Sequence, residues 1–492
     1  MGLQVKSGGR PTVGINIGSS LIKVVEARLG KDGIQVTALG VAPTPPGSID
    51  NEIVVDPQAL GQAIRQLLTE SGISCKRSVS SVAGQSSVIV RIIEVPRMTK
   101  QELAETMKWE VERHVPFAAS EVVMDFLPIE RPTTSPDDQN MEVLLAVAQQ
   151  EVVNSHVEAL FAAGLEPVAI DVEALAVGRS LIDMSSNGAR GQTIAIVNIG
   201  AAATELGIYQ NGLLAFPRTL PIAGDAITRA LSEGLNLSAE QAERLKRERA
   251  VVLADRAAPA PEVAPIGDYG RPGETVGLSA LGAEEAPSGD LDFIPGLGYG
   301  LPAEEKAEAE SAVPEFDIDM GEAAPEPAKP VMDFDLSAGE QEPAPAPGPY
   351  LDLSGPVGGE AEAEDLPVPA AYDVSASDER GEVALSEFSE ELISDTMSPV
   401  LNDLIAEIRR SLEYYASRFQ SQPDRILLCG GTSKLKGLDE LFQAELGIPV
   451  VLANPLQNVM VLSKVVSQDY LEEVAAVFPV SFGLAIRDMI GE

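Results

Sequence analysis

The chain has 492 residues, a length that normally holds two or more domains with cores of their own. Its formal net charge of −40 argues against a nucleic-acid binder, because phosphate contacts need clustered Lys and Arg. Two Cys and two His residues are too few for a disulfide framework and argue against a His-based metal site. No run of 18 apolar residues occurs, so we expect a soluble chain without direct membrane insertion.

The first 100 residues alternate between apolar runs and polar segments. Short continuous or alternating apolar runs predict strands, and a longer stretch with helical periodicity predicts a helix. We expect strands at 12–18, 21–29, 78–84 and 87–95 and a helix at 56–72.

A second helix is expected at 99–115. Thr99 is its N-cap and Glu102 its capping-box partner. Three apolar residues at i, i+4 and i+8 give it one apolar face: Leu103, Met107 and Val111. We place Trp109, the only Trp, in the core of the same unit.

The following segments complete a small α+β unit. The pattern predicts strands at 124–130 and 141–149, a helix at 151–164 and a strand at 167–173. Taken with the preceding strand and helix, this order predicts a compact α+β unit.

The second half opens as the first does. Strands are expected at 193–200, 204–212 and 213–222, followed by helices at 224–235 and 238–250. A long helix at 398–419 carries Pro399 near its first turn, where proline is tolerated. A buried strand at 425–431, a helix at 434–447 and a strand at 449–455 follow. The fold class is therefore α/β with an internally repeated three-stranded opening.

A segment at 251–383 differs sharply in composition from the rest. From Val251 to Glu382 it holds 30 acidic and five basic residues amid repeats such as PAPAPGP. Such a segment buries too little apolar area to offset its ordering entropy, about 1 to 2 kcal/mol per residue. We expect it to be disordered, either as a spacer or, through short repeats such as MDFDLSAGE, as a docking segment.

Two stretches carry nearly the same pattern. VGINIGSS at 13–20 and IAIVNIGAAA at 194–203 each run an apolar strand into Asn-Ile-Gly and small residues. The amides and hydroxyls of such a loop can grip an anion, although one loop alone also fits an ordinary tight hairpin. Two loops from two halves of one chain suggest a nucleotide clamped between them. The candidate residues are Gly18, Ser19, Ser20 and Lys23 in the first loop, Gly200, Ala201 and Ala202 in the second, and Gly430, Gly431 and Ser433 at a third Gly-rich strand end, where a flat base could lie.

These features resemble the actin-like ATPases and, within them, the PilM family of type IV pilus assembly, a relative of FtsA. The likeness rests on VGINIGSSLIKVVEA, MKWEVERHVPF, LPIAGDAIT, SAEQAERLK, AEIRRSLEYY and CGGTSKLKGLDELFQAELGIPV. It covers almost everything except the acidic segment and the extreme N-terminus. It implies the actin-like, ribonuclease H-like duplicated α/β fold, with two lobes, a small inserted α+β subdomain and a long disordered acidic insertion. The implied bounds are 1–84 and 171–193 for the first lobe, 85–170 for the inserted subdomain, 194–250 and 384–492 for the second lobe with a C-terminal return helix, and 251–383 for the insertion.

The same resemblance implies ATP as cofactor, with or without magnesium. Glu243 and Lys246 match the family pattern that contacts ribose and base, although a solvated helix with i,i+3 charge pairing would look the same. Gly224 with Asp225 matches the glycine turn beside the phosphates.

The chain departs from the family at two positions. Asn16 and Asn198 stand where the family normally has Asp residues that hold the magnesium shell and help polarise the attacking water. Asn would hold magnesium only weakly, through water, and an amide cannot act as a base. Loss of base assistance alone typically costs about 10² to 10⁴ in rate. We therefore assign no catalytic residue and expect at most a weak ATPase.

The resemblance further implies a cytoplasmic scaffold of type IV pilus assembly. Its partners would be the N-terminal cytoplasmic tail of a PilN-like inner-membrane protein and other pilus machinery proteins, with self-association left open. The tail would lie between the inserted subdomain and the first lobe, and would hold the chain peripherally at the inner membrane. Two alternatives remain: a polymerising cytoskeletal ATPase like FtsA or MreB, and a sugar-kinase-like phosphotransferase, which would need a carboxylate base in its cleft.

Overall fold

The computed structural model describes most of the chain outside the acidic segment. The described residues are 10–31, 33–50, 52–84, 87–131, 139–185, 189–253, 385–462 and 467–490. They belong to one compact unit, which takes in residues 1–267 and 380–492. The expected disorder of 251–383 lies outside the described residues, except at its first three positions. There Val251 forms a β-bridge with Lys436, and Val252 is buried in a hydrophobic core. The packed part of the chain therefore continues past the expected boundary.

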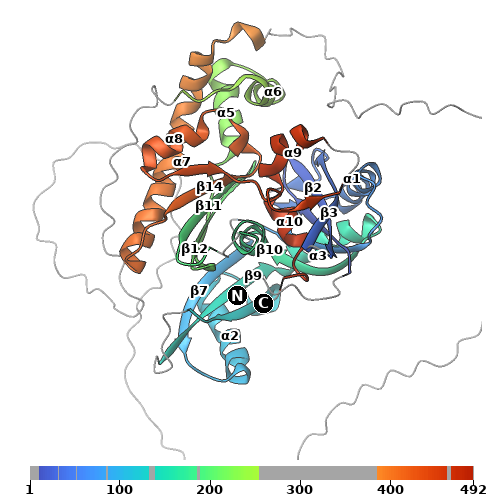
Figure 1. Ribbon diagram of the computed structural model, residues 1–492, viewed down its shortest axis with the longest axis vertical. Helices are drawn as coiled ribbons and strands as arrows, with labels where there is room; N and C mark the ends of the chain where they lie inside the picture. Colours follow the sequence, from blue (N-terminus) through green and yellow to red (C-terminus); the bar gives the residue numbers. More distant parts are fainter. Residues whose placement is uncertain are drawn as a thin grey trace, which may run out of the picture. The chain divides into compact units, whose positions relative to one another are not determined.

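The first sheet has six strands in the order β10-β6-β1-β2-β3-β16. Figure 1 labels three of them, β2, β3 and β10. They are β1 (Thr12–Ile17), β2 (Leu21–Gly30), β3 (Gly33–Pro43), β6 (Arg77–Val82), β10 (Glu166–Val172) and β16 (Met460–Val461). β1, β2 and β3 form an antiparallel meander, and β6 runs parallel to β1. The short strands β4 (Ile49–Asp50) and β5 (Ile53–Val54) pair beside this sheet.

Helices cover both faces of the first sheet. α1 (Pro57–Glu70) and α3 (Gln150–Ala162) pack on the face that carries Val24. α10 (Pro479–Ala485) packs on the face that carries Val25, after the short α9 (Gln468–Val474). Because both faces are covered, β2 is apolar at successive positions rather than at every second one.

The second sheet has five strands in the order β13-β12-β11-β14-β15. They are β11 (Thr193–Ile199), β12 (Thr204–Gln210), β13 (Leu213–Leu220), β14 (Arg425–Cys429) and β15 (Val450–Leu452). β11, β12 and β13 repeat the antiparallel meander of the first sheet. One large core packs it against α5 (Gly224–Leu235), α6 (Ala239–Arg249), α7 (Glu390–Phe419) and α8 (Leu438–Leu446).

A third, three-stranded sheet has the order β7-β9-β8. Its strands are β7 (Val88–Pro96), β8 (Val122–Ile129) and β9 (Asn140–Gln149), and α2 (Lys100–His114) covers one face. The capping box of Thr99 and Glu102 is confirmed, as is the buried face of Leu103, Met107 and Val111. Trp109, which we expected in the core, is 69% exposed because it lies off that face.

The small α+β unit is shorter than the sequence pattern suggested. We grouped α3 and β10 with the preceding strands, but β10 pairs in parallel with β6 in the first sheet. α3 packs on α1, where the ideal Cβ of Gly61 would lie 2.5 Å from Ala162 Cβ. The pattern misled us because the sequence of an amphipathic helix does not indicate which sheet it packs on, and that of an apolar strand does not indicate which sheet it joins.

The long helix α7 also differs from its expectation. It begins at Glu390, with Ser389 as N-cap, so Pro399 lies inside the helix rather than in its first turn. Proline removes one intrahelical hydrogen bond, a cost that tertiary packing can offset. Met397 and Leu401, on either side of it, are fully buried in the core of the second sheet.

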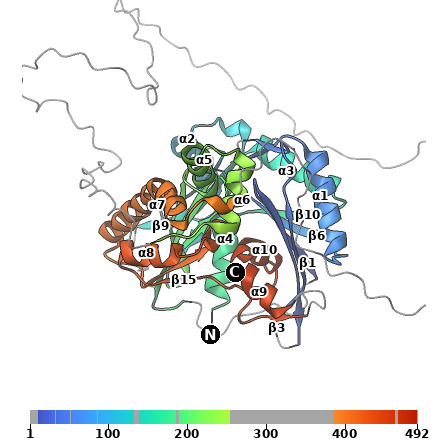
Figure 2. The same cartoon turned by 90° about the horizontal axis from the view of Figure 1, so that it is seen from above.

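α4 (Glu173–Gly178) links the two sheets and continues into a π-helical turn, Arg179–Asp183. α4 and α10 lie side by side (Figure 2). Within the described ranges, no helix has both the length and the apolar character to cross a lipid bilayer.

Two glycines let α10 pack this closely. An ideal Cβ on Gly483 would lie 1.8 Å from the carbonyl oxygen of Ala176, and one on Gly14 would lie 2.0 Å from that of Ser481. Backbone atoms cannot rotate away as a flexible side chain can. Any side chain at these positions must therefore push α10 off α4 or β1.

We expect Gly483→Ala to lower the free energy of unfolding by about 1 to 3 kcal/mol, the usual cost of overpacking a tight contact. Gly431→Ala is the matched control, because its Cβ would meet nothing within 4 Å. Urea denaturation of both variants checks this. Equal stabilities of the two variants would contradict the close packing of α10.

Candidate functional site

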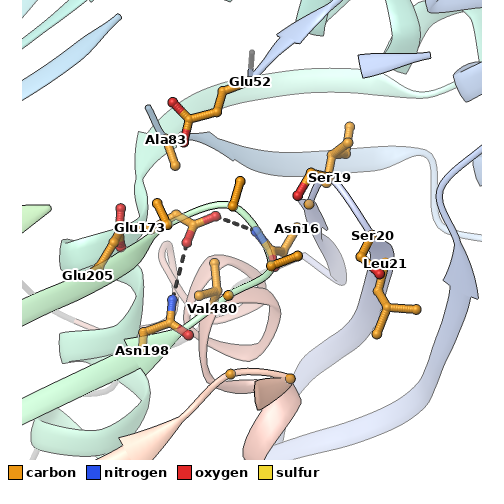
Figure 3. A pocket seen from close by; sticks show the side chains of 18 of the residues that line it. Asn16, Ser19, Ser20, Leu21, Glu52, Ala83, Glu173, Asn198, Glu205 and Val480 are labelled. Atoms are coloured by element: carbon orange, nitrogen blue, oxygen red, sulfur yellow. Dashed lines mark hydrogen bonds between the residues drawn. The ribbon is translucent and has the colours of Figure 1, made fainter. Parts of the chain in front are cut away.

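A cavity of about 210 Å³ lies between the ends of β1 and β11 (Figure 3). Its walls come from the β1–β2 turn, the β11–β12 turn, the first residue of α4 and the turn after β14. Parts of the chain that are far apart in sequence therefore form one site, as the twin loops required.

The two turns are built alike. In each, the Gly amide donates to the carbonyl oxygen three residues on at 3.0 Å: Gly18 to Leu21, and Gly200 to Ala203. The residue opposite the Asn differs, since Asn16 faces Lys23 across its hairpin and Asn198 faces Glu205. The repeat is thus one of backbone geometry, with a cation in the first copy and a carboxyl group in the second.

Glu173 lies between the two Asn residues and is the residue that the sequence analysis missed. Asn16 Nδ2 donates to Glu173 Oε1 at 2.6 Å, and Asn198 Nδ2 donates to Glu173 Oε2 at 3.3 Å (Figure 3). A signal existed in the sequence, because Glu173 directly follows an apolar strand. The carboxyl ends of the parallel strands β1, β6 and β10 meet at one sheet edge, which is where ligand sites form.

Burial perturbs the ionisable groups of this cavity. Desolvation raises the pKa of Glu173, while the nearby Lys23 charge and the two Asn amides lower it in part. Desolvation lowers the pKa of Lys23, against the attraction of Glu173. The pKa of Glu205 is raised well above its usual value by burial and by the charges of Glu173 and Glu52. Its Oε2 is buried and has no hydrogen-bond partner in the described part of the chain.

Most of the expected site residues line this cavity. They are Asn16, Gly18, Ser19, Ser20, Lys23, Asn198, Gly200, Ala201, Ala202, Glu243, Lys246, Gly430 and Gly431. Their roles toward a ligand stay predictions. Thr432 also lines the cavity and was not expected to.

Three expected residues support the cavity from behind instead of lining it. The amides of Gly224 and Asp225, at the start of α5, donate to the carbonyl oxygens of Gly200 and Ala201, at 3.1 and 2.8 Å. Those amides are therefore used to brace the second turn. Ser433 is buried, and its hydroxyl donates to the carbonyl oxygen of Gly430 at 2.8 Å, within its own turn.

The first turn is braced in a similar way by Thr44, just after β3. The Thr44 hydroxyl donates to the carbonyl oxygen of Gly18 at 2.6 Å, and its amide donates to that of Ser20 at 3.0 Å. Both turns are thus held by hydrogen bonds to their carbonyl groups. This bracing leaves Ser19 exposed at the cavity.

α6 supplies the charged wall on the second-sheet side. Lys246 Nζ donates to Glu243 Oε2 at 2.6 Å, to the Thr228 hydroxyl at 2.7 Å and to the carbonyl oxygen of Gly224 at 3.0 Å. Burial alone would raise the pKa of Glu243, but the hydrogen bonds of Lys246 and Thr228 outweigh it and lower the pKa. Arg247 pairs with Glu243 and donates to the Ser20 hydroxyl across the cavity at 3.3 Å.

The cavity holds cationic side chains that could contact an anionic ligand, beside the carboxyl groups of Glu52, Glu173, Glu205 and Glu243. Lys23, Lys246 and Arg247 line the cavity, and Gly431 leaves its backbone open. Within the described residues, no cluster of three or more His, Cys, Asp or Glu side chains could hold a metal ion. A magnesium ion here would depend on oxygens of the ligand itself, as it commonly does with phosphates.

Two covered sheets that open on matched turns around one cavity define an actin-like protein. The family model described as type IV pilus assembly protein PilM matches residues 14–253. The model described as cell division protein FtsA matches residues 195–471, more than half of the chain. The chain is therefore a PilM-like, actin-like protein and belongs to the family that contains PilM and FtsA.

Individual relatives agree with this assignment. Cell division protein FtsA of Bacillus subtilis is 23% identical over 48% of this chain, and FtsA of Pseudomonas aeruginosa is 24% identical over 58%. The matches span 57% and 72% of those two proteins. A solved structure described as a PilM-PilN type IV pilus biogenesis complex is 24% identical, with a TM-score of 0.64. It covers 98% of this chain and 99% of its own. That likeness shows the shared fold.

His156, which also lines the cavity, gives a pH-dependent prediction. Burial lowers its pKa from 6.5 to about 4, and its Nε2 lies 2.7 Å from the Ser80 hydroxyl. Ser80 donates its proton to the carbonyl oxygen of Ile15 at 2.6 Å, so the neutral His156 must donate through Nε2.

The unfolded chain takes up a proton on His156 below about pH 6.5, whereas the folded chain does not until about pH 4. The free energy of unfolding should therefore fall by about 2 kcal/mol from pH 7.5 to pH 5 through this residue alone. His156→Gln keeps the donor but cannot titrate, so its loss should be smaller by that amount. Urea denaturation at both pH values measures this fall for the parent chain and for His156→Gln. An equal fall in the free energy of unfolding for the two proteins would contradict a buried neutral His156.

Proposed function

We propose that the chain holds ATP in the cavity between the two sheets and acts as a nucleotide-stabilised scaffold of type IV pilus assembly. One observation carries this proposal: two turns with the same closing hydrogen bond face each other across one cavity. Backbone amides at such turns, together with Lys23, suit a polyphosphate. The open backbone at Gly431 suits the base.

Nucleotide would act here by stabilising one arrangement of the two sheets. A ligand that contacts both turns binds the arrangement that brings them together, and so adds to the stability of that arrangement by its differential affinity. Lys246 and Glu243 would contact the sugar and base, which agrees with their place in the wall of the cavity.

The cavity does contain carboxyl groups, which corrects one argument for slow hydrolysis. We held that the twin Asn residues leave the cleft without a carboxylate base, yet Glu173 and Glu205 line it. Two features still favour slow or absent turnover. Each oxygen of Glu173 already accepts an amide hydrogen bond, and the buried Oε2 of Glu205 has, within the described residues, no hydrogen-bond partner that would orient it as a base.

Magnesium would be held mainly by the nucleotide in this account. Asn16 and Asn198 carry no charge, and their Nδ2 groups are engaged with Glu173. Only the amide oxygens remain to accept hydrogen bonds from water on the ion. Nucleotide affinity should therefore depend weakly on magnesium.

We infer that the protein partner is the N-terminal cytoplasmic tail of a PilN-like inner-membrane protein. A structure of the same fold is described as a PilM-PilN complex. On β8, an edge strand of the third sheet, Val123 and Leu127 are 47% and 52% exposed. α3, which packs on the first sheet, touches β8, so these two apolar side chains, with the exposed Asp125 between them, lie where the inserted subdomain meets the first lobe. Such a partner would place the chain in the cytoplasm at the inner membrane.

Measurement of ATP affinity and turnover on one preparation, with and without magnesium, tests the nucleotide proposal. We expect micromolar binding that changes less than about tenfold without magnesium, and negligible turnover. Turnover near one per second would contradict the scaffold, and absence of binding would contradict the nucleotide site. Lys23→Met should weaken binding about tenfold or more through loss of a charge-assisted contact.

Binding of a synthetic PilN-like N-terminal peptide tests the partner proposal. Leu127→Asp should weaken peptide binding by at least about fivefold, because a carboxylate would enter an apolar contact. Val451→Asp is the matched control, since Val451 is 51% exposed on β15 of the second sheet. Equal affinities for both variants in isothermal titration calorimetry would place the tail elsewhere.

A further inference from the structure

The Asn16, Glu173 and Asn198 side chains form a continuous bridge from one sheet to the other. Asn16 is the penultimate residue of β1, and Asn198 is the penultimate residue of β11. Glu173, the first residue of α4, gives one carboxylate oxygen to each amide. These three side chains connect the strand ends at which the two turns begin (Figure 3).

This arrangement explains why the residue is Asn in both copies. Asn16 Nδ2 lies 2.6 Å from a carboxylate oxygen, a distance that requires a proton between the two atoms. An Asp there would bring two carboxylates together, and the charge of Glu52 already acts on Glu173. Such a cluster would repel itself unless a cation entered. The amide supplies the proton without adding charge.

We propose that Asn16, Glu173 and Asn198 form a clasp that sets the separation of the two turns, with Glu173 as its positioning residue. Hydrogen bonds to a charged acceptor are stronger than neutral ones and are directional. A planar carboxylate that accepts one bond on each oxygen therefore fixes the relative position of both donors. The clasp goes beyond nucleotide binding, because it needs neither ligand nor metal ion.

The charged groups around the clasp come from several elements. Lys23 on β2 attracts Glu173, whereas Glu52, between β4 and β5, repels it, and the charge of Glu173 in turn acts on the carboxyl group of Glu205 on β12. Net charge at the site is therefore a separate quantity from hydrogen-bond polarity, that is, which group donates and which accepts. A test must change one of the two and keep the other constant.

A swap of hydrogen-bond polarity provides that test. Asn16→Asp should break the clasp, since two carboxylates then face each other. Adding Glu173→Gln should restore it, because the Gln amide can donate to the new Asp while its oxygen still accepts from Asn198. Asn16→Asp with Glu205→Gln is the matched control. It has the same net charge as the restored variant but no donor facing the Asp.

The separation of the two sheets can be measured with spin labels on Cys residues placed at Gln62 on α1 and Glu240 on α6. Both positions are exposed. To prevent labelling elsewhere, Cys75 would be changed to Ser, whereas Cys429 is buried and can stay. In pulsed electron resonance without nucleotide or magnesium, we expect a narrow distance distribution for the parent chain. Asn16→Asp should broaden it toward longer distances, Glu173→Gln should narrow it again, and Glu205→Gln should leave it broad.

A narrow distribution for Asn16→Asp alone would overturn the clasp, as would failure of Glu173→Gln to narrow it or equal rescue by Glu205→Gln. Asn198→Asp with and without Glu173→Gln repeats the test from the other sheet, should Asn16→Asp fail to fold. Since the measurement uses no nucleotide, its outcome is independent of whether ATP binds.

Discussion

The carboxylate of Glu173 accepts one hydrogen bond from the end of each major sheet, and much of the site is arranged around it. β10 delivers Glu173 to the edge where β1 ends, and α4 carries the chain onward to β11. α10 packs on both α4 and β1 through two glycines that leave no room for a side chain. The position of Glu173 thus depends on the packing of α10 against α4 and β1, while the hydrogen bonds of the two Asn residues fix its carboxylate oxygens.

Around this carboxylate, two turns of the same backbone form have different chemistry. The first carries Ser19, Ser20 and Lys23, whereas the second has only alanines after its Gly and a buried carboxyl group, Glu205, at the position of Lys23. Duplication preserves the backbone hydrogen bond that forms the turn, but it does not preserve the side chains. The first turn is therefore suited to contact phosphate by charge and hydroxyl groups, and the second mainly by its backbone.

Local sequence signals were sufficient for most of the fold. The capping box at Thr99, the twin Asn-Ile-Gly turns and the Gly pair after β14 depend on neighbours within a few residues, and the structure has each where it was expected. α3 and β10 were assigned to the wrong sheet, because the identity of a packing partner is a long-range property. Pro399 was placed at a helix start because its local cost is high, yet buried contacts on both sides offset that cost.

The candidate site shows the same division. The loop residues were found from pattern and resemblance, and most line one cavity. Glu173 was not, since its contacts with Asn16 join residues 157 positions apart. We expected three further residues to contact the ligand, but they donate hydrogen bonds to carbonyl oxygens of the turns instead: Gly224, Asp225 and Ser433. A motif identifies which residues are near a site, whereas only the fold decides which of them face it.

We propose that both turns hold one nucleotide. Hydrogen exchange of the backbone amides with and without ATP tests it directly, because amides that bind phosphate become protected. We expect protection at 19–21 and at 201–203 in the same titration, with the same midpoint in ATP, since the amides of Gly18 and Gly200 already donate within their turns. Protection of only one turn, or of neither, would contradict a nucleotide held between the two sheets.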